Sequence, residues 1–506
     1  MTLDPFNTTV AAPMLLAIVE PYSTAVFLLV VGVLIGVSGL ISKTADRLGV
    51  PVVLLFLVLG MLGGSEGLGG IEFTDYSVAV RLGTMALVLI LFDGGLNTSF
   101  SSIRQVIGPA SVLATFGVAA TAGLVALSAW VLGLPWPAAL LLGAVVSSTD
   151  AAAVFAVLRG GGASLKPRVG RTIEVESCIN DPMAVILTTT MIQFLTAEQP
   201  LGWRPLLDVP IQLAVGAGVG IVLGFLGVFV LRRVRLGTVG LYPALTLALA
   251  FFSFGAATVA YGSGFMAVYA TGVVLGNKAI PYRSGLARVH DALAWLSQIG
   301  MFLMLGLLVF PSRLLDIVGV GLAVSLFLAF IARPLAVVPF LLPFGYTLRE
   351  AAYVGWVGLR GAVPIVLATF PVLAGVEGAS RVFDLVFFIV VVSSIVPGST
   401  IRFVTRRLGF EAAQKPRPPA VLEVNATTTL QGELTSYHID RTVAVSGARL
   451  REIEFPPGSA IVLVIRGSEI IAARGDTTLQ PGDHAYVFFR PEDRPLIEIL
   501  FGQPED

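Results

Sequence analysis

Charged residues are scarce in this chain of 506 residues: they make up 13% of it, whereas 56% of the residues are hydrophobic. Soluble domains carry about 25% charged residues, so most of this chain cannot cover a surface that faces water. The formal net charge is +0, which argues against nucleic acid as a partner, because such a partner requires a basic patch. The composition therefore predicts a polytopic α-helical membrane protein.

Residues that build disulfides, zinc sites and thiol nucleophiles are nearly absent. The single cysteine, Cys178, cannot form an intrachain disulfide and lies in an apolar helical pattern, where packing is its expected role. The three histidines, His290, His438 and His484, are too far apart in sequence for a zinc-binding pattern such as HExxH. We therefore expect neither a bound cofactor nor an enzymatic activity.

Apolar stretches run through most of the chain. A helix that crosses a membrane needs roughly 20 mostly apolar residues, or fewer where it is broken inside the protein. About thirteen stretches meet this requirement. They lie at approximately 22-41, 50-64, 76-96, 105-133, 137-159, 170-196, 209-231, 240-261, 264-277, 289-310, 315-343, 348-371 and 380-404.

Lysines and arginines alternate along the loops between these stretches. They gather at the ends of the odd-numbered stretches, for example at Arg104 and Arg232, whereas the other ends hold few, such as Arg313. The positive-inside rule then places the N-terminus outside and the C-terminus in the cytosol. Arg333 lies inside the eleventh stretch and is followed by Pro334, and we expect it to snorkel toward the cytoplasmic side.

The composition changes after about residue 408. Residues 409–422 form a Pro-containing polar linker between a transmembrane domain, residues 1–408, and a small cytosolic α+β domain, residues 423–506. In the latter, four strands are expected, in TLQGELTSYHI, AIVLVIRG, EIIAAR and HAYVFF. Two short helices are expected in ARLREI and PEDRPLIEILF.

Two of the apolar stretches are interrupted in their middle. Residues 143–157, GAVVSSTDAAAVFAV, and residues 355–369, GWVGLRGAVPIVLAT, place glycine or polar residues there, and their stretches cross in opposite directions. Such a pair predicts inverted repeats with crossing broken helices, as in transporters whose substrate site lies near the midplane. Pro364 supports a break because it lacks a backbone donor and so frees a carbonyl. The alternative is a pair of kinked packing helices, since Gly and Pro are frequent in membrane helices.

The stretch RTIEVESCINDPMAVILTTT, residues 171–190, carries several polar residues in an apolar helical pattern. Burying such residues is costly unless they have partners, so they are candidates for function. Ser177 and Asp181 are four residues apart, as are Glu176 and Asn180. On a helix these pairs lie on neighbouring faces, and all four side chains can point into one cavity.

Thr149 and Asp150 lie in the middle of the interrupted stretch at 137-159. Together with Asp181 and Ser177 they offer carboxylate and hydroxyl oxygens, which suit a hard cation such as K+ or Na+. Asp181 and Asp150 are therefore the candidate ligands of a transported cation. Two carboxylates close together also titrate as a unit, so the same atoms can hold either a cation or a proton, and mutually exclusive binding gives exchange.

Other polar residues in the membrane stretches are expected to support this site. Arg360 lies in the middle of an interrupted stretch, and Glu176 is its natural carboxylate partner, as a scaffold pair or as a transport group. The scaffold role is favoured, because it leaves Asp181 free to titrate. Asn180 does not titrate and is expected to orient its neighbours by hydrogen bonds. Asp93, in LFDGGLN near a predicted cytoplasmic helix end, is either a solvated helix-end residue or a functional one.

Three motifs, SSTDAAAVF, ESCINDPMAVIL and GLRGAVPIVLA, resemble those of the cation:proton antiporter-1 family in its branch with an Asn-Asp pair. The resemblance covers residues 22 to 404 and implies a homodimer of thirteen-helix subunits, in which a six-helix transport part moves in an elevator-like way against a dimerisation part. By motif position it implies an ion- and proton-binding role for Asp181, a place in the unwound crossing helix for Asp150 and Thr149, a ligand role for Ser177, and a pair between Glu176 and Arg360.

Two details of the motifs refine this expectation. In the family the Asn-Asp pair, here Asn180 and Asp181, is associated with electroneutral exchange. Family members often have Pro directly after the aspartate of the first broken helix, whereas this chain has Ala151. That difference puts the geometry of the break in question, although not the carboxylate of Asp150.

The tail from about residue 423 to residue 502 resembles the TrkA-C (RCK-C) subdomain of the family that regulates potassium conductance, most closely in ARLREIEFPPGSAIVLVIRGSEIIAARGDTTLQPGDHAYVFFRPED. That subdomain dimerises and can bind a small regulatory nucleotide, of which the cyclic dinucleotide cyclic di-AMP is a known type. Its presence on a transporter favours K+ over Na+ as the transported cation.

These observations predict a K+/H+ antiporter of a bacterial inner membrane, with Na+/H+ exchange as the close alternative. A ligand-gated potassium channel is a more distant alternative, based on the tail alone. It would need a selectivity filter such as TVGYG, which the sequence lacks. A membrane enzyme would need a metal or nucleophile constellation, and an ion-regulated sensor would leave Asp150 and Asp181 unexplained.

Overall fold

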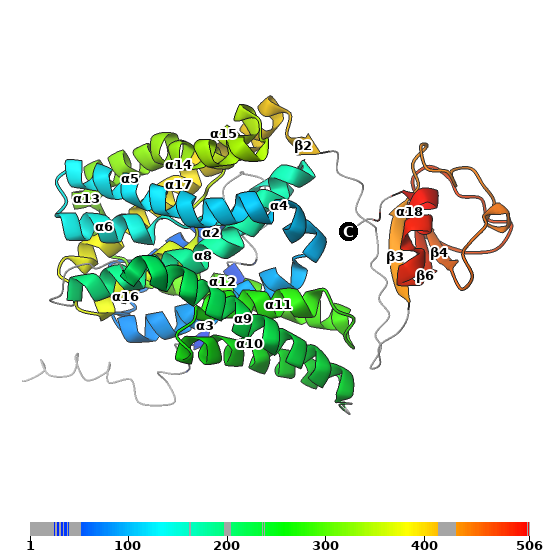
Figure 1. The fold of residues 1–506 in the computed structure, drawn as a ribbon, viewed down its shortest axis with the longest axis horizontal. Coiled ribbons are helices and arrows are strands. Elements are labelled where there is room, and N and C mark those ends of the chain that lie inside the picture. The colour runs from blue at the N-terminus through cyan, green and yellow to red at the C-terminus, as the bar shows by residue number, and fades with distance from the viewer. Residues whose placement is uncertain are drawn as a thin grey trace, which may run out of the picture.

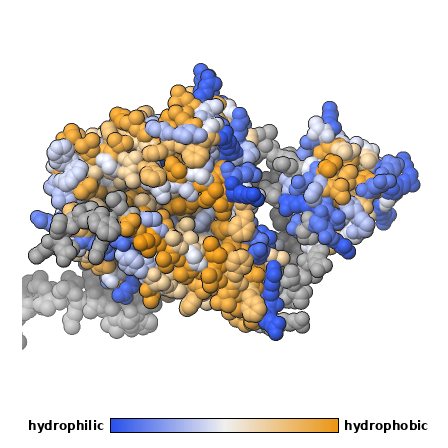
Figure 2. Space-filling model, viewed as in Figure 1, coloured by the Kyte–Doolittle hydropathy of each residue, from blue (hydrophilic) through white to orange (hydrophobic). Residues whose placement is uncertain are grey.

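The computed structural model describes residues 52–160, 163–196, 204–234, 236, 238–412, 432–502 and 504, with scattered positions between 25 and 39. Helices dominate up to residue 408, and a small sheet follows residue 432 (Figure 1). Among the described residues, seven helices have at least 18 residues and are apolar enough to cross a membrane. Apolar residues also cover most of the visible face of the helical part (Figure 2), as contact with lipid requires.

Each predicted membrane stretch from residue 50 onward coincides with a helix or with helices in succession. In the first half these are α2 (Val52–Gly63), α3 (Tyr76–Asn97), α4 (Phe100–Val112), α5 (Val118–Val131), α6 (Trp136–Val145), α7 (Ala151–Gly160) and α8 (Pro167–Thr196). In the second half they are α9 (Arg204–Arg233), α10 (Leu241–Val259), α11 (Gly264–Gly276), α12 (Arg283–Leu307), α13 (Pro311–Phe327), α14 (Arg333–Leu341), α15 (Leu348–Trp356), α16 (Ala362–Leu373) and α17 (Ala379–Leu408). The first predicted stretch, 22-41, lies mostly outside the described residues, so the total of thirteen stays a prediction.

Both predicted interruptions are present as true breaks. Residues 146–150 separate α6 from α7, and residues 357–361 separate α15 from α16. Neither segment is helical, which excludes the alternative of two continuous, kinked helices. Helices broken at this depth are tolerated only where protein surrounds the freed backbone groups.

A second irregularity is repeated in the two halves of the chain. One π-helical segment, Leu113–Gly117, joins α4 to α5, and another, Leu328–Ala332, joins α13 to α14. Helix α14 packs against the first of these segments and α5 against the second. In each half, therefore, a helix with a π segment precedes a broken helix, as expected for the predicted inverted repeats.

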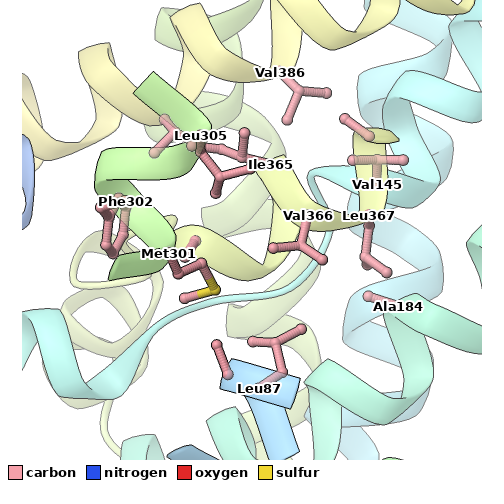
Figure 3. Close-up of a cluster of buried hydrophobic side chains, with 14 of the residues drawn as sticks. Leu87, Val145, Ala184, Met301, Phe302, Leu305, Ile365, Val366, Leu367 and Val386 are labelled. Atoms are coloured by element: carbon pink, nitrogen blue, oxygen red, sulfur yellow. The ribbon is translucent and has the colours of Figure 1, made fainter. Parts of the chain in front are cut away.

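An apolar core lies beside the breaks (Figure 3). The side chains labelled there come from six helices, which include α16, directly after one break, and α6, whose last residue directly precedes the other. The labelled members are Leu87, Val145, Ala184, Met301, Phe302, Leu305, Ile365, Val366, Leu367 and Val386. This packing holds the non-helical segments between helices that cannot easily shift.

Helices α2 and α12 approach each other closely at two glycines. A Cβ atom at Gly306 would lie 2.8 Å from the Cα atom of Gly60, and it would also clash with the carbonyl oxygen of Leu57. Small residues at such a contact let two helix backbones approach and gain dispersion energy. The contact therefore depends on the absence of a side chain at both positions.

Two short strands join distant parts of the helical region. Strand β1 (Ser164–Leu165) lies between α7 and α8, and it pairs antiparallel with β2 (Glu411–Ala412), which follows α17. The backbone N–H of Lys166 extends this pairing by donating to the carbonyl of Phe410 at 3.0 Å. The chain is thus attached to the loop between α7 and α8 just before residue 413, where the described residues stop.

The C-terminal part is a four-stranded antiparallel sheet in the order β3-β6-β4-β5, with α18 (Arg494–Phe501). The strands are β3 (Glu433–His438), β4 (Ala460–Arg466), β5 (Glu469–Ala472) and β6 (Asp483–Phe489). This confirms the predicted α+β fold, although ARLREI forms only a single 3-10 turn at Leu450–Glu452. The buried carboxylate of Asp483 is paired with Arg466 at 2.7 Å.

Replacing Gly306 by alanine should push α2 and α12 apart and lower the thermal midpoint of the detergent-purified protein. Overpacking of this kind costs about 1–3 kcal/mol. The matched control is Gly300→Ala on the same helix, where a Cβ atom meets nothing within 4 Å. Equal midpoints for the two variants would contradict the described contact.

Candidate functional site

The two non-helical segments cross and are hydrogen-bonded to each other. The backbone N–H of Asp150 donates to the carbonyl of Leu359 at 2.8 Å, and Nε of Arg360 donates to the carbonyl of Val146 at 3.1 Å. Arg360 also donates from Nη1 to the carbonyl of Gly358. Backbone groups that the breaks release are thus paired inside the protein, where an unpaired group would be costly.

The carboxylate of Asp150 packs against the other broken segment within this crossing. Its Oδ1 accepts a hydrogen bond of 3.1 Å from the backbone N–H of Ala153, in the first turn of α7. Its Cγ lies 2.7 Å from the position that a Cβ atom would occupy at Gly361, and Oδ2 is closer still. Asp150 is therefore both a charged group and a structural part of the crossing itself.

Ser177 of α8 holds the start of α7 in place. Its hydroxyl donates to the carbonyl of Thr149 at 2.9 Å and accepts from the backbone N–H of Ala151 at 3.1 Å. The helix begins at Ala151, so alanine preserves the break here. A proline at position 151 would lack a backbone N–H. Alanine has one, and the hydroxyl of Ser177 accepts its hydrogen bond.

Asn180 of α8 orients the side chain of Thr149, which lies in the break between α6 and α7. Its Nδ2 donates to Oγ1 of Thr149 at 2.7 Å and makes a longer contact of 3.5 Å with Oε1 of Glu176. All three side chains are buried. The hydrogen bonds of Ser177 and Asn180 tie α8 to both the backbone and the side chain of Thr149.

Asp181 lies near the middle of α8 and yet remains partly exposed. Its carboxylate interacts electrostatically with Asp150 and with Glu176, and the hydroxyl of Ser148 is also close to it. The structure therefore brings two carboxylates together at the crossing.

The ion pair at the site differs from the predicted one. Nη2 of Arg333 donates to Oε1 of Glu176 at 2.6 Å, and both side chains are only 1% exposed. The expected pair of Glu176 with Arg360 is therefore wrong, and so is the expectation that Arg333 snorkels to the membrane surface. Arg360 lies close enough to interact electrostatically with Glu176, but its hydrogen bonds go to backbone carbonyls.

The irregular helix before Arg333 accounts for this difference. The π segment Leu328–Ala332 ends directly before Arg333, and an extra residue in a helical turn rotates the following side chains by about 100°. Gly358 supplies the space, because a Cβ atom there would lie 2.7 Å from Nε of Arg333. A prediction that assumes regular helices includes neither the π segment before Arg333 nor the space that Gly358 leaves for its side chain.

Asp93 is the one predicted site residue whose described contacts lie elsewhere. Its Oδ1 accepts from Nδ2 of Asn97 at 3.1 Å on the same helix, α3, and it interacts electrostatically with Asp291 of α12.

Two residues of the site, Arg333 and Ser148, were absent from the predicted set. For Ser148 the available signal was its place in SSTD, directly before Thr149.

Two family models match this chain. The family described as sodium/hydrogen exchanger, transmembrane, matches residues 8–407, and the TrkA-C domain matches residues 434–502. The first match covers more than half of the chain and contains every residue of the crossing. The second covers the C-terminal sheet.

Characterised relatives align over both regions. The chain is 41% identical over 475 residues to the K(+)/H(+) antiporter NhaP of Alkalimonas amylolytica, which covers 94% of this chain and 83% of that protein. It is also 41% identical over 485 residues to the K(+)/H(+) antiporter NhaP2 of Shewanella sp. strain ANA-3, with the same coverage. The Na(+)/H(+) antiporter NhaS2 of Synechocystis sp. is 26% identical over 424 residues and covers 79% of this chain and 75% of that protein.

A solved structure has a similar fold. The sodium proton antiporter MjNhaP1 from Methanocaldococcus jannaschii, determined at pH 8, superposes with a TM-score of 0.63 at 24% sequence identity. The match covers 74% of this chain and 99% of that chain. This likeness supports the arrangement of the helices.

Replacing Glu176 by glutamine should leave the charge of Arg333 buried without a counter-ion, at a cost of about 3–5 kcal/mol. If Arg333 is the partner, adding Arg333→Met to Glu176→Gln should restore the thermal midpoint of the purified protein. Adding Arg360→Met should restore it less, because Arg360 also holds the crossing. Better rescue by Arg360→Met would favour the pair predicted from the sequence.

Proposed function

Because this chain belongs to the sodium/hydrogen exchanger family, we propose that it is a secondary transporter, with no enzymatic activity, that exchanges a monovalent cation for protons across a membrane. The observation that carries this proposal is the meeting of Asp150 and Asp181 beside two crossing broken helices. Both residues are half-buried. Such a site can bind a small cation and can equally be discharged by protons.

In the proposed cycle, Asp181 is the residue that binds either the cation or the proton. The carboxylate of Asp150 already accepts a hydrogen bond from the backbone at the start of α7, whereas Asp181 interacts with the side chains of Ser148, Asp150 and Glu176. Thr149 and Ser177 would complete the oxygen ligands with Asp150. Since one carboxylate cannot hold both ligands at once, each crossing carries one or the other, and alternating access then produces exchange.

The charges around the crossing support a one-for-one, electroneutral exchange. Asp150, Asp181 and Glu176 contribute three carboxylates, and Arg333 and Arg360 contribute two guanidinium groups, which leaves one net negative charge. One monovalent cation or one proton neutralises it. Either loaded form then crosses the membrane without net charge, which is the least costly form in a low-dielectric interior. Asn180 contributes no further charge.

Potassium is the proposed cation. Relatives that are 41% identical over both the membrane and the tail regions are named K(+)/H(+) antiporters. The TrkA-C domain at residues 434–502 points in the same direction, because its family is associated with potassium conductance. Sodium is the alternative, since a more distant relative is named an Na(+)/H(+) antiporter.

The proposal also covers the location, the orientation, the oligomeric state and the domains of the protein. We place the protein in a bacterial inner membrane, N-terminus outside and C-terminus in the cytosol, because its basic loops alternate. The working unit is a homodimer. It is divided into a transport domain of residues 1–408, a linker of residues 409–422 and a regulatory domain of residues 423–506. The transport reaction uses no cofactor, and a cyclic dinucleotide is the proposed ligand of the tail.

Everted membrane vesicles with an imposed pH gradient test the exchange directly. Adding K+ should dissipate the gradient, with a weaker response to Na+. Asp181→Asn should abolish the response, because the amide neither titrates nor carries the charge that attracts the cation. The matched control is Asp316→Asn, an exposed aspartate on α13, which should respond like the unmodified protein. Exchange that survives Asp181→Asn would remove Asp181 from the site.

The same vesicles separate an antiporter from a channel. A channel would carry K+ with no obligatory movement of protons, so collapse of the membrane potential by K+ would not require a pH gradient. An electroneutral antiporter should exchange at equal rates with and without a membrane potential. A conductance that persists in Asp181→Asn would favour the channel.

A further inference from the structure

Ser148 is a buried hydroxyl in the non-helical segment between α6 and α7, and it takes no part in the hydrogen bonds that hold the crossing together. Its side chain is 1% exposed, and its Oγ makes no hydrogen bond to any residue that the structure describes. The hydroxyl lies near enough to the carboxylate of Asp181 to interact with it. An oxygen buried in this state is unusual, because buried polar groups are nearly always paired.

The neighbouring hydroxyls are already engaged in holding the break. Ser177 both donates and accepts within 3.1 Å, to Thr149 and from Ala151. Oγ1 of Thr149 accepts from Asn180 at 2.7 Å. Ser147, the residue before Ser148, donates to the carbonyl of Ala144 at 2.7 Å. Among these hydroxyls, Ser148 alone makes no hydrogen bond to a described residue, and it lies near the carboxylate that is proposed to bind the cation.

We infer that Ser148 is a direct oxygen ligand of the transported cation and a determinant of its affinity, acting together with the carboxylate of Asp181. This inference rests on the proposed exchange function. A cation that leaves water must recover its hydration shell from protein oxygens, and the number of these oxygens contributes to discrimination between K+ and Na+. A proton bound to Asp181 needs no further oxygen ligand, so removal of the hydroxyl should weaken cation binding more than proton binding.

This asymmetry defines the test. In vesicles or proteoliposomes that contain the full chain, Ser148→Ala should raise the K+ concentration for half-maximal exchange about tenfold, or ~1.4 kcal/mol in binding. The effect on the maximal rate should be smaller. Ser148→Thr keeps a hydroxyl and should remain close to the unmodified protein. The matched control is Ser147→Ala, which removes a neighbouring buried hydroxyl that is already paired, and it should leave the K+ dependence unchanged.

A second measurement excludes a purely structural role. K+ should raise the thermal midpoint of the purified protein, because a ligand that binds the folded state stabilises it. This K+-dependent rise should shrink in Ser148→Ala, whereas the midpoint without K+ should stay the same or increase, since an unpaired buried hydroxyl has been removed.

The possible outcomes separate this inference from the function on which it rests. An unmodified K+ dependence in Ser148→Ala, or an equal shift in Ser147→Ala, would overturn the ligand role and leave the exchanger intact. A lower thermal midpoint of Ser148→Ala in the absence of K+ would show that Ser148 stabilises the fold, and this result would also overturn the ligand role. If the unmodified protein gives no cation-dependent response, the exchange function fails, and the ligand role fails with it.

Discussion

Each backbone donor and acceptor at membrane depth must find a partner inside the protein, and the crossing of the two broken helices is where this chain meets that constraint. Two interrupted helices release several such groups at one place. The chain pairs them with one another, from Asp150 to Leu359, and with a guanidinium group, from Arg360 to Val146. The charged residues of the site are therefore inseparable from the break itself.

The buried charges follow from the same constraint. A guanidinium that caps backbone carbonyls brings a positive charge into the interior, and a second one arrives with Arg333. Glu176 compensates one of them. The other is balanced by the two aspartates, which together retain the capacity to bind one more positive charge. The residues that pair the free backbone groups thus leave one net negative charge at the crossing, which is the charge that the proposed cation or proton would neutralise.

The sequence was sufficient for features that depend on composition and spacing. Glycine and polar residues in the middle of 143–157 and 355–369 marked both breaks, and helical spacing placed Glu176, Ser177, Asn180 and Asp181 on one element. The partner of Glu176 could not be predicted in this way. The π segment before Arg333 changes which face of the helix the side chain occupies, and Gly358 opens the space for it. Both effects depend on packing between segments that are far apart in the sequence.

The strand pair between β1 and β2 determines where the tail is attached. An antiparallel pair has a fixed register, here Ser164 with Ala412 and Leu165 with Glu411, so β2 cannot slide by one residue without losing its hydrogen bonds. Strand β1 lies in the loop that joins α7, which starts directly after Asp150, to α8, which carries Asp181. A displacement of the chain at Ala412 would therefore be transmitted to the loop between the two helices that carry the aspartates of the proposed cation site.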